Sequence, residues 1–273
     1  MKNLQPKPSP YSQNLEEKKI WYSPTADAYN KFRPSYPQKI INRVVELAQL
    51  EPTNSILEIG CGPGKATVDF AKLGYAMVCL EPNLNFCQLA KQNCSPYSNV
   101  EIQNTSFEEW ELQEGKFDAV LAASSLHWVS QDIVYPKAAS ALKDDGYIIL
   151  LWNVVPEPNP EIYQVCQEVY QAYAPAIGEY ESPQAQRESL RIIGESSIKS
   201  GKFKNLVSGE MVSEATYTIE DYLALLSTLS PYLKLESKAR GLLFSGMREQ
   251  IAKHWREGVQ VSFRAVFHLA QKC

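Results

Sequence analysis

The stretch ILEIGCGPGKAT (residues 56–67) places Gly60, Gly62 and Gly64 directly after an apolar run and ahead of a predicted helix. Glycine has no Cβ, so it permits a sharp turn and lets backbone N–H groups come close to a ligand. The same residues also suit a plain tight turn before a helix. The strand and helix around them favour a ligand-binding loop.

Two phosphate-binding motifs do not match the spacing of this loop. A P-loop reads GxxxxGK[ST], but Lys65 follows GCGPG and precedes Ala66, which offers no hydroxyl for magnesium. A dinucleotide site reads G-x-G-x-x-G, whereas this loop reads G-x-G-x-G with Pro63 stiffening the turn. Nucleoside triphosphates and an NAD-dependent dehydrogenase are therefore disfavoured.

An acid follows the next apolar run. AMVCLEP ends at Glu81 and Pro82, and a carboxylate at a strand end can accept hydrogen bonds from both hydroxyls of a ribose. The alternative is a carboxylate that faces only solvent. Together with the glycine loop, Glu81 predicts an adenosine-containing ligand.

The rest of the chain continues the alternation of strand and helix. Further predicted strands are NVEIQN, FDAVLAA, GYIILLWN, FKNLVSGEMVSEATYT and VQVSFRAVFHLAQK. Short apolar runs alternating with helices predict a doubly wound α/β fold, with a mostly parallel sheet that binds ligands at the carboxyl ends of its strands. The last strand alternates apolar and polar residues, so we expect it to be an antiparallel edge strand.

The flanking segments predict the domain organisation. Residues 1–20 are polar and proline-rich and show neither a helical nor a strand period, so we expect a mobile tail. Residues 21–273 are expected to form a single domain, with 156–200 inserted as a helical cap that selects the substrate.

Composition limits the partners. The net charge of -4, with Lys and Arg dispersed, gives no footprint for nucleic acid and favours a small-molecule partner. The absence of a long apolar run or a signal peptide predicts a cytoplasmic protein without stable membrane association. The six cysteines form no CxxC pair, so neither a disulfide framework nor a metal site is expected.

EIGCGPG (residues 58–64) followed by Glu81 resembles motif I and the acidic residue after it in the class I S-adenosylmethionine-dependent methyltransferases. YNKFRPSYP, FDAVLAASSLHWV and VSFRAVFHLAQ resemble the methyltransferase type 11 subgroup that includes trans-aconitate methyltransferase, so the resemblance covers nearly all of residues 21–273. It implies a Rossmann-like seven-stranded sheet and S-adenosylmethionine as cofactor, with S-adenosylhomocysteine as product. A monomer or a homodimer is compatible with it.

The resemblance also implies site residues. Glu58 would help to bind the ammonium group of the cofactor directly or through water, and Arg33 would reach its carboxylate, unless Arg33 is only a surface cation at a helix end. Ser106 stands where an aspartate usually reads the adenine, and Phe107 would stack on the base. The full set of implied cofactor residues is Arg33, Glu58, Gly60, Cys61, Gly62, Gly64, Glu81, Pro82, Ser106, Phe107 and Ser124.

The acceptor side would follow the fourth strand. The Asn/Asp-Pro-Pro-aromatic clamp of the nitrogen-directed adenine methyltransferases is absent, so base methylation is not expected. His127 is the candidate catalytic residue, and the alternative is a histidine that packs and shapes the cofactor site. Tyr22, Trp128, Trp152 and Asn153 are candidates for the substrate pocket.

We therefore expect a small-molecule methyltransferase directed at the oxygen of a carboxylate or hydroxyl. A carboxylate is ionised at neutral pH and needs no general base. The alternative is an adenosine-ligand-binding module or assembly factor without turnover, which the unusual Ser106 suggests.

Overall fold

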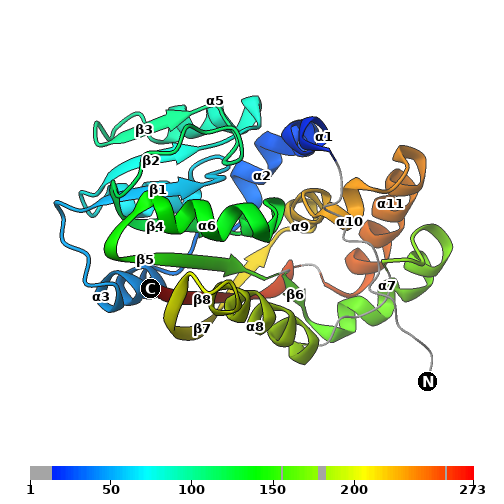
Figure 1. The fold of residues 1–273 in the computed structure, drawn as a ribbon. Helices are drawn as coiled ribbons and strands as arrows, with labels where there is room; N and C mark the ends of the chain where they lie inside the picture. Colours follow the sequence, from blue (N-terminus) through cyan, green and yellow to red (C-terminus); the bar gives the residue numbers. More distant parts are fainter. Residues whose placement is uncertain (1–13, 155, 178–182, 256) are drawn as a thin grey trace, which may run out of the picture.

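A computed structural model describes residues 14–154, 156–177, 183–255 and 257–273. At its centre is an eight-stranded sheet with the order β3-β2-β1-β4-β5-β8-β6, in which β7 also pairs with β8 (Figure 1). The strands are β1 (Ser55–Ile59), β2 (Ala76–Leu80), β3 (Val100–Gln103), β4 (Phe117–Ala123), β5 (Leu142–Asn153), β6 (Glu157–Pro158), β7 (Phe203–Tyr217) and β8 (Val259–Lys272).

The first five strands are parallel to one another, and β8 runs antiparallel to β5, β6 and β7. The predicted doubly wound, mostly parallel α/β fold is thereby confirmed, and the one strand beyond the predicted seven is the two-residue β6. The predicted edge position of β8 is wrong, because β8 lies between β5 and β7. Its polar alternation is confined to its first half, whereas Ala265–Ala270 is buried on both faces.

Helices cover both faces of the sheet because buried side chains alternate along each strand. Leu57 and Ile59 of β1 join the core under α6 and α8, whereas Ile56 joins the core under α3 and α4. Apart from the helical group described next, the helices are α1 (Leu15–Ile20), η1 (Ser23–Thr25), α2 (Ala26–Phe32), α3 (Gln38–Leu47), α4 (Lys65–Ala71), α5 (Leu84–Asn93), η2 (Leu126–Trp128), α6 (Gln131–Ala141) and α8 (Pro183–Lys199).

A separate helical group lies beyond the carboxyl end of β5 (Figure 1). It consists of α7 (Pro160–Tyr173), α9 (Ile219–Ser227), α10 (Ser230–Leu233) and α11 (Ser237–His254), which share one apolar core with the first half of β8. Of the predicted cap at 156–200, helix α7 belongs to this helical group. Helix α8 packs on β7 and β8, because Leu190 is buried in the sheet core and Gly194 lies against the ring of His268.

The N-terminal segment also differs from the prediction. Residues 1–13 of the predicted tail lie outside the described residues, but Leu15–Ile20 forms helix α1. Asn14 begins this helix, since its side chain accepts a hydrogen bond from Glu17 N at 2.9 Å. Asn14 and Glu17 have the spacing of a capping box, a signal that identifies this start from sequence. No described helix combines the length and apolar character needed to cross a bilayer.

Candidate cofactor and acceptor site

One cavity of about 490 Å³ opens at the carboxyl ends of the parallel strands. Loops after β1 to β5 form its floor, and parts of α1, α8 and α10 complete its walls. Most of the predicted site residues line it together: Tyr22, Arg33, Gly60, Cys61, Gly62, Glu81, Pro82, Ser106, Phe107, Ser124, His127, Trp128, Trp152 and Asn153.

The glycine loop and the acid after β2 are in direct contact. Gly62 N donates a hydrogen bond to Glu81 Oε2 at 2.7 Å, and Asn83 N donates to Glu81 Oε1 at 2.8 Å. Burial raises the pKa of Glu81 to about 7, although these two hydrogen bonds oppose the shift. Each carboxylate oxygen keeps a further lone pair for a ligand.

The three glycines have different surroundings. Gly62 has φ +56° and no atom near the place a Cβ would take, so its bare backbone faces open space. A Cβ on Gly60 would lie 2.8 Å from Ser125 Cβ, and one on Gly64 would lie 3.2 Å from Cys94 Sγ. Gly62 is thus the position whose missing side chain leaves room for a ligand, whereas Gly64 does not line the cavity and serves packing.

Glu58 lies beneath the glycine loop. Its side chain is fully buried and does not line the cavity, because it lies on the same face of β1 as Ile56, under α4. Thr67 Oγ1 donates a hydrogen bond to Glu58 Oε2 at 2.6 Å, and burial raises the pKa of Glu58 to about 7. Glu58 therefore supports the glycine loop from beneath and has no direct contact with the cavity.

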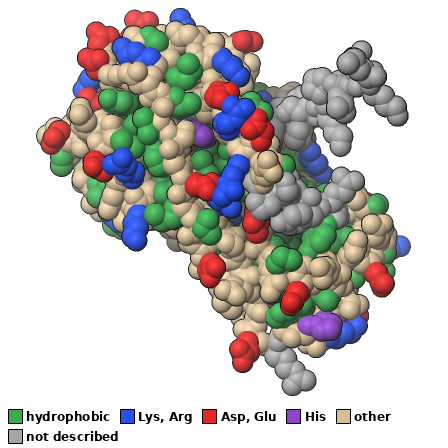
Figure 2. All heavy atoms as spheres, turned by 90° about the horizontal axis from the view of Figure 1, so that it is seen from below, with side chains coloured by type: hydrophobic (Ala, Val, Ile, Leu, Met, Phe, Trp, Pro, Cys, Tyr) green, Lys and Arg blue, Asp and Glu red, His purple; other side chains and the backbone are tan. Residues whose placement is uncertain are grey.

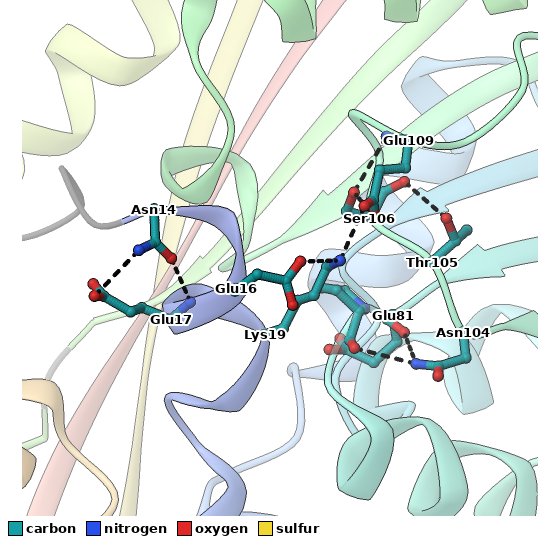
Figure 3. Close-up of polar contacts among 10 residues, drawn as sticks. Asn14, Glu16, Glu17, Lys19, Glu81, Asn104, Thr105, Ser106 and Glu109 are labelled. Carbon is teal, nitrogen blue, oxygen red and sulfur yellow. Dashed lines mark hydrogen bonds and ion pairs between the residues drawn. The ribbon is translucent and has the colours of Figure 1, made fainter.

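The loop after β3 carries Ser106 and Phe107, which both line the cavity. Figure 3 shows Ser106 beside Glu109 of the same loop. Ser106 Oγ accepts from Glu109 N at 3.2 Å and donates to Glu109 Oε2 at 2.8 Å, so this hydroxyl stabilises its own turn. Lys137 of α6 donates to the carbonyls of Phe107 at 2.8 Å and Glu108 at 3.1 Å. Sequence reasoning missed Lys137, because nothing in its own helix signals a contact with this loop.

Helix α1 covers the same loop. Lys19 Nζ lies between Glu16 Oε1 at 2.8 Å and Glu109 Oε1 at 3.0 Å (Figure 3). Lys18 Nζ donates to the carbonyl of Trp128 at 2.7 Å, and Leu15 and Lys18 both line the cavity. The segment predicted as a mobile tail thus contributes a wall.

Residues 33–36 connect the helical group to the sheet. Arg33 donates from Nε and Nη2 to Thr228, at 2.8 Å to Oγ1 and 2.9 Å to the carbonyl. Tyr36 Oη and Ser124 Oγ are 2.8 Å apart, and Asn153 Nδ2 donates to the carbonyl of Pro34 at 3.1 Å. Tyr36 is a cavity residue that the sequence did not single out.

His127 lies among aromatic rings. Its ring centre is 5.5 Å from that of Trp128 and 5.2 Å from that of Trp152. Burial lowers the pKa of His127 to about 4, so the imidazole is neutral at pH 7. Within the described part of the chain, no group of three metal-ligating side chains gathers.

Residues 56–146 match a family model described as a methyltransferase domain. An uncharacterized methyltransferase of Mycobacterium tuberculosis is 30% identical over 126 residues, which is 46% of this chain and 49% of the relative. The chain thus matches about half the length of this relative.

Two solved structures extend the similarity of fold to most of the chain. One, described as a type II methyltransferase from Anaeromyxobacter dehalogenans, has a TM-score of 0.68 at 17% identity and covers 88% of this chain and 98% of its own. The other is a Haemonchus contortus phosphoethanolamine N-methyltransferase bound to S-adenosylhomocysteine. Its TM-score is 0.53 at 17% identity, covering 94% of this chain and 58% of its own. The fold is therefore the Rossmann-like methyltransferase fold.

The matched family model and this relative are described as methyltransferases, and the two solved structures share the fold of this chain.

Proposed function

We propose that this protein transfers a methyl group from S-adenosylmethionine to a small molecule, at the oxygen of a carboxylate or hydroxyl. The observation that carries the proposal is the contact between Gly62 N and Glu81 Oε2, two residues that both line the cavity. It joins a bare backbone surface to a carboxylate, the two features that an adenosine needs.

The cofactor would extend along the strand ends. Glu81 would accept hydrogen bonds from the ribose hydroxyls, and Gly62 would lie against the ribose. Ser106 and Phe107 would flank the adenine, whereas Arg33 and Ser124 would hold the methionine part. Arg33 keeps Nη1 beyond its two contacts with Thr228, so a carboxylate can still be recognised.

The bound cofactor supplies an electrophilic methyl group on a sulfonium. Because the leaving group is neutral, the main task of the protein is to align donor and acceptor and to exclude water. Trp128, Trp152 and Tyr22 would form the apolar wall for the acceptor. The low pKa of His127 makes it a poor proton acceptor, so we assign it an orienting role.

Several finer points belong to the same proposal: membership of the trans-aconitate methyltransferase-like subgroup, a cytoplasmic location, and a monomeric or homodimeric state. A small-molecule acceptor is supported by the charge distribution. On the face seen in Figure 2, acidic and basic side chains are interspersed, which does not favour a polyanion.

Isothermal titration with S-adenosylhomocysteine tests cofactor binding. Glu81→Gln should weaken it by about tenfold or more, because charge-assisted hydrogen bonds to the ribose are lost. Glu101→Gln, at an exposed acid on the neighbouring strand β3, is the matched control. No heat at millimolar ligand would refute the proposal.

Incubation with labelled S-adenosylmethionine and a metabolite extract, followed by mass spectrometry, tests turnover. A labelled small molecule supports the proposal. Label in added RNA alone would refute the small-molecule acceptor, and cofactor binding without any transfer would favour the binding module without turnover.

A further inference from the structure

Two buried polar atoms on the cavity wall have no hydrogen-bond partner. They are Nε1 of Trp152, at the end of β5, and Oε1 of Gln186, in the first turn of α8. The side chains are only 7% and 8% exposed, and both residues line the cavity. Buried polar atoms are nearly always hydrogen-bonded, so two without partners in the lining of one cavity point to a ligand group that both can reach.

These two residues lie at the β5 end of the cavity, where the proposed acceptor would bind. Arg187, the neighbour of Gln186, forms an ion pair with Glu210 of β7. Glu210 and Trp152 both pair with Val266 of β8, from opposite sides, so the first turn of α8 lies near the end of β5. In the sheet, β5 is three strands from β2, which carries Glu81 at its end. With neighbouring strands about 4.8 Å apart, the separation is about 14 Å, which leaves space for a second molecule beside an adenosine at Glu81.

We propose that Trp152 and Gln186 together recognise a neutral hydroxyl of the methyl acceptor. The indole N–H only donates, so the ligand group must accept. The amide oxygen accepts, so the ligand group must also donate. A hydroxyl does both, and this inference rests on the proposed function for the identity of the second ligand. The pair positions the acceptor, whether or not the recognised hydroxyl is the atom that receives the methyl.

A carboxylate fits this position less well, because a buried anion needs a cation or several donors. Among the described residues that line the cavity, the basic ones are Lys18, Arg33 and Lys65. Lys18 donates to the carbonyl of Trp128, Arg33 is assigned above to the carboxylate of the cofactor, and Lys65 begins α4 after the glycine loop. The surroundings of Trp152 are aromatic and aliphatic instead, with His127 beside its ring and Val154 and Leu190 in its cluster.

Direct binding of probe molecules tests this inference independently of turnover. The probes are two matched pairs, 4-methylphenol with 4-methylbenzoate and 1-hexanol with hexanoate, titrated by ligand-observed NMR into protein saturated with S-adenosylhomocysteine. We expect at least one alcohol to bind about fivefold or more tightly than its carboxylate, the effect of one well-paired buried hydrogen bond.

Four variants locate the effect. Trp152→Phe and Gln186→Leu should each weaken binding of the preferred alcohol by about fivefold or more. Gln186→Glu keeps an acceptor oxygen and should retain the alcohol within about threefold of wild type. Gln184→Leu, at an exposed position on the same helix, is the control and should bind it as wild type does. Melting curves confirm that each variant folds.

The inference is overturned if the carboxylates bind as tightly as the alcohols, if no alcohol binds at millimolar concentration, or if Trp152→Phe and Gln186→Leu both bind like wild type. S-adenosylhomocysteine affinity is measured separately and should change less than about twofold in all four variants. If that ligand does not bind, the proposed function fails, and the probe titrations on the unliganded protein still decide this inference.

Discussion

The backbone N–H of Gly62 lies 2.7 Å from Oε2 of Glu81, so the loop after β1 and the acid after β2 form one surface before any ligand arrives. This pre-organisation reduces the ordering that binding requires. The roles of the two residues can be separated by mutation, because Gly62 contributes space for the ligand and Glu81 contributes charge.

Gly62→Ala should impair cofactor binding more than folding. Its positive φ makes alanine strained by about 1–2 kcal/mol, and the added methyl would enter the space that faces the ligand. Gly115→Ala is a matched control, since Gly115 has φ +58° and open space but lies in an exposed turn away from the cavity. Thermal unfolding should change similarly in both variants. Titration with S-adenosylhomocysteine should weaken only in Gly62→Ala, and equal affinities would contradict the assigned role.

Cofactor affinity should rise with pH between about 5.5 and 8. The pKa of Glu81 is raised from 4.5 to about 7, so the unliganded carboxyl is largely protonated below pH 7, whereas ribose hydroxyls donate best to the carboxylate. Binding below pH 7 should therefore release a proton, which titration in buffers of different ionisation enthalpy detects. Glu81→Gln should flatten the pH profile, and an unchanged slope in that variant would assign the proton to another group.

The same shift predicts how stability changes with pH. A carboxyl whose pKa is higher in the folded than in the unfolded state binds a proton on folding, so its contribution to stability is present at low pH and is lost as pH rises from about 4.5 to 7. Glu58→Gln should make the free energy of unfolding, measured with urea, fall less steeply as pH rises. The variant should leave the pH dependence of cofactor affinity unchanged, because Glu58 does not line the cavity.

His127→Asn should lower kcat/KM by less than about tenfold, since loss of a true general base costs about 100-fold or more. With a pKa of about 4, the imidazole does not titrate between pH 5.5 and 8. The pH profile of the variant should therefore keep the shape of the wild-type profile over that range. The loss of an ionisation from the profile would show that His127 acts as a base.

Lys137→Met should loosen the loop that carries Ser106 and Phe107. The ammonium group donates to several backbone carbonyls of this loop, and methionine cannot replace those bonds. We expect a lower melting temperature and cofactor affinity reduced by about threefold or more. Lys91→Met, at an exposed lysine on α5, serves as control and should leave both quantities unchanged.

The sequence was sufficient to predict the sheet and most of the cavity, because the relevant signals are local. The glycine loop, Glu81, and the residues after β3, β4 and β5 all follow recognisable apolar runs. Parallel strands bring such positions to one edge without further information.

The errors came from contacts between distant segments. The strand pattern identifies Glu58 as an acid beside the loop, but which face of β1 it occupies depends on α4 packing above it. The burial of β8 depends on β7 forming outside it, and the position of Gln186 depends on α8 packing against the sheet. Lys137 likewise meets its loop only in the folded protein.

The central position of β8 has a consequence for biosynthesis. Trp152 and Asn153 pair with Val266 and Ala265, and α8 packs on β8 as well as on β7. A nascent chain that has emerged as far as α8 already contains both partners of the Gly62–Glu81 contact. Trp152 and Asn153 can gain their strand partners only after β8 has been synthesised, so the wall formed by β5 would be completed later than the contact between the glycine loop and Glu81.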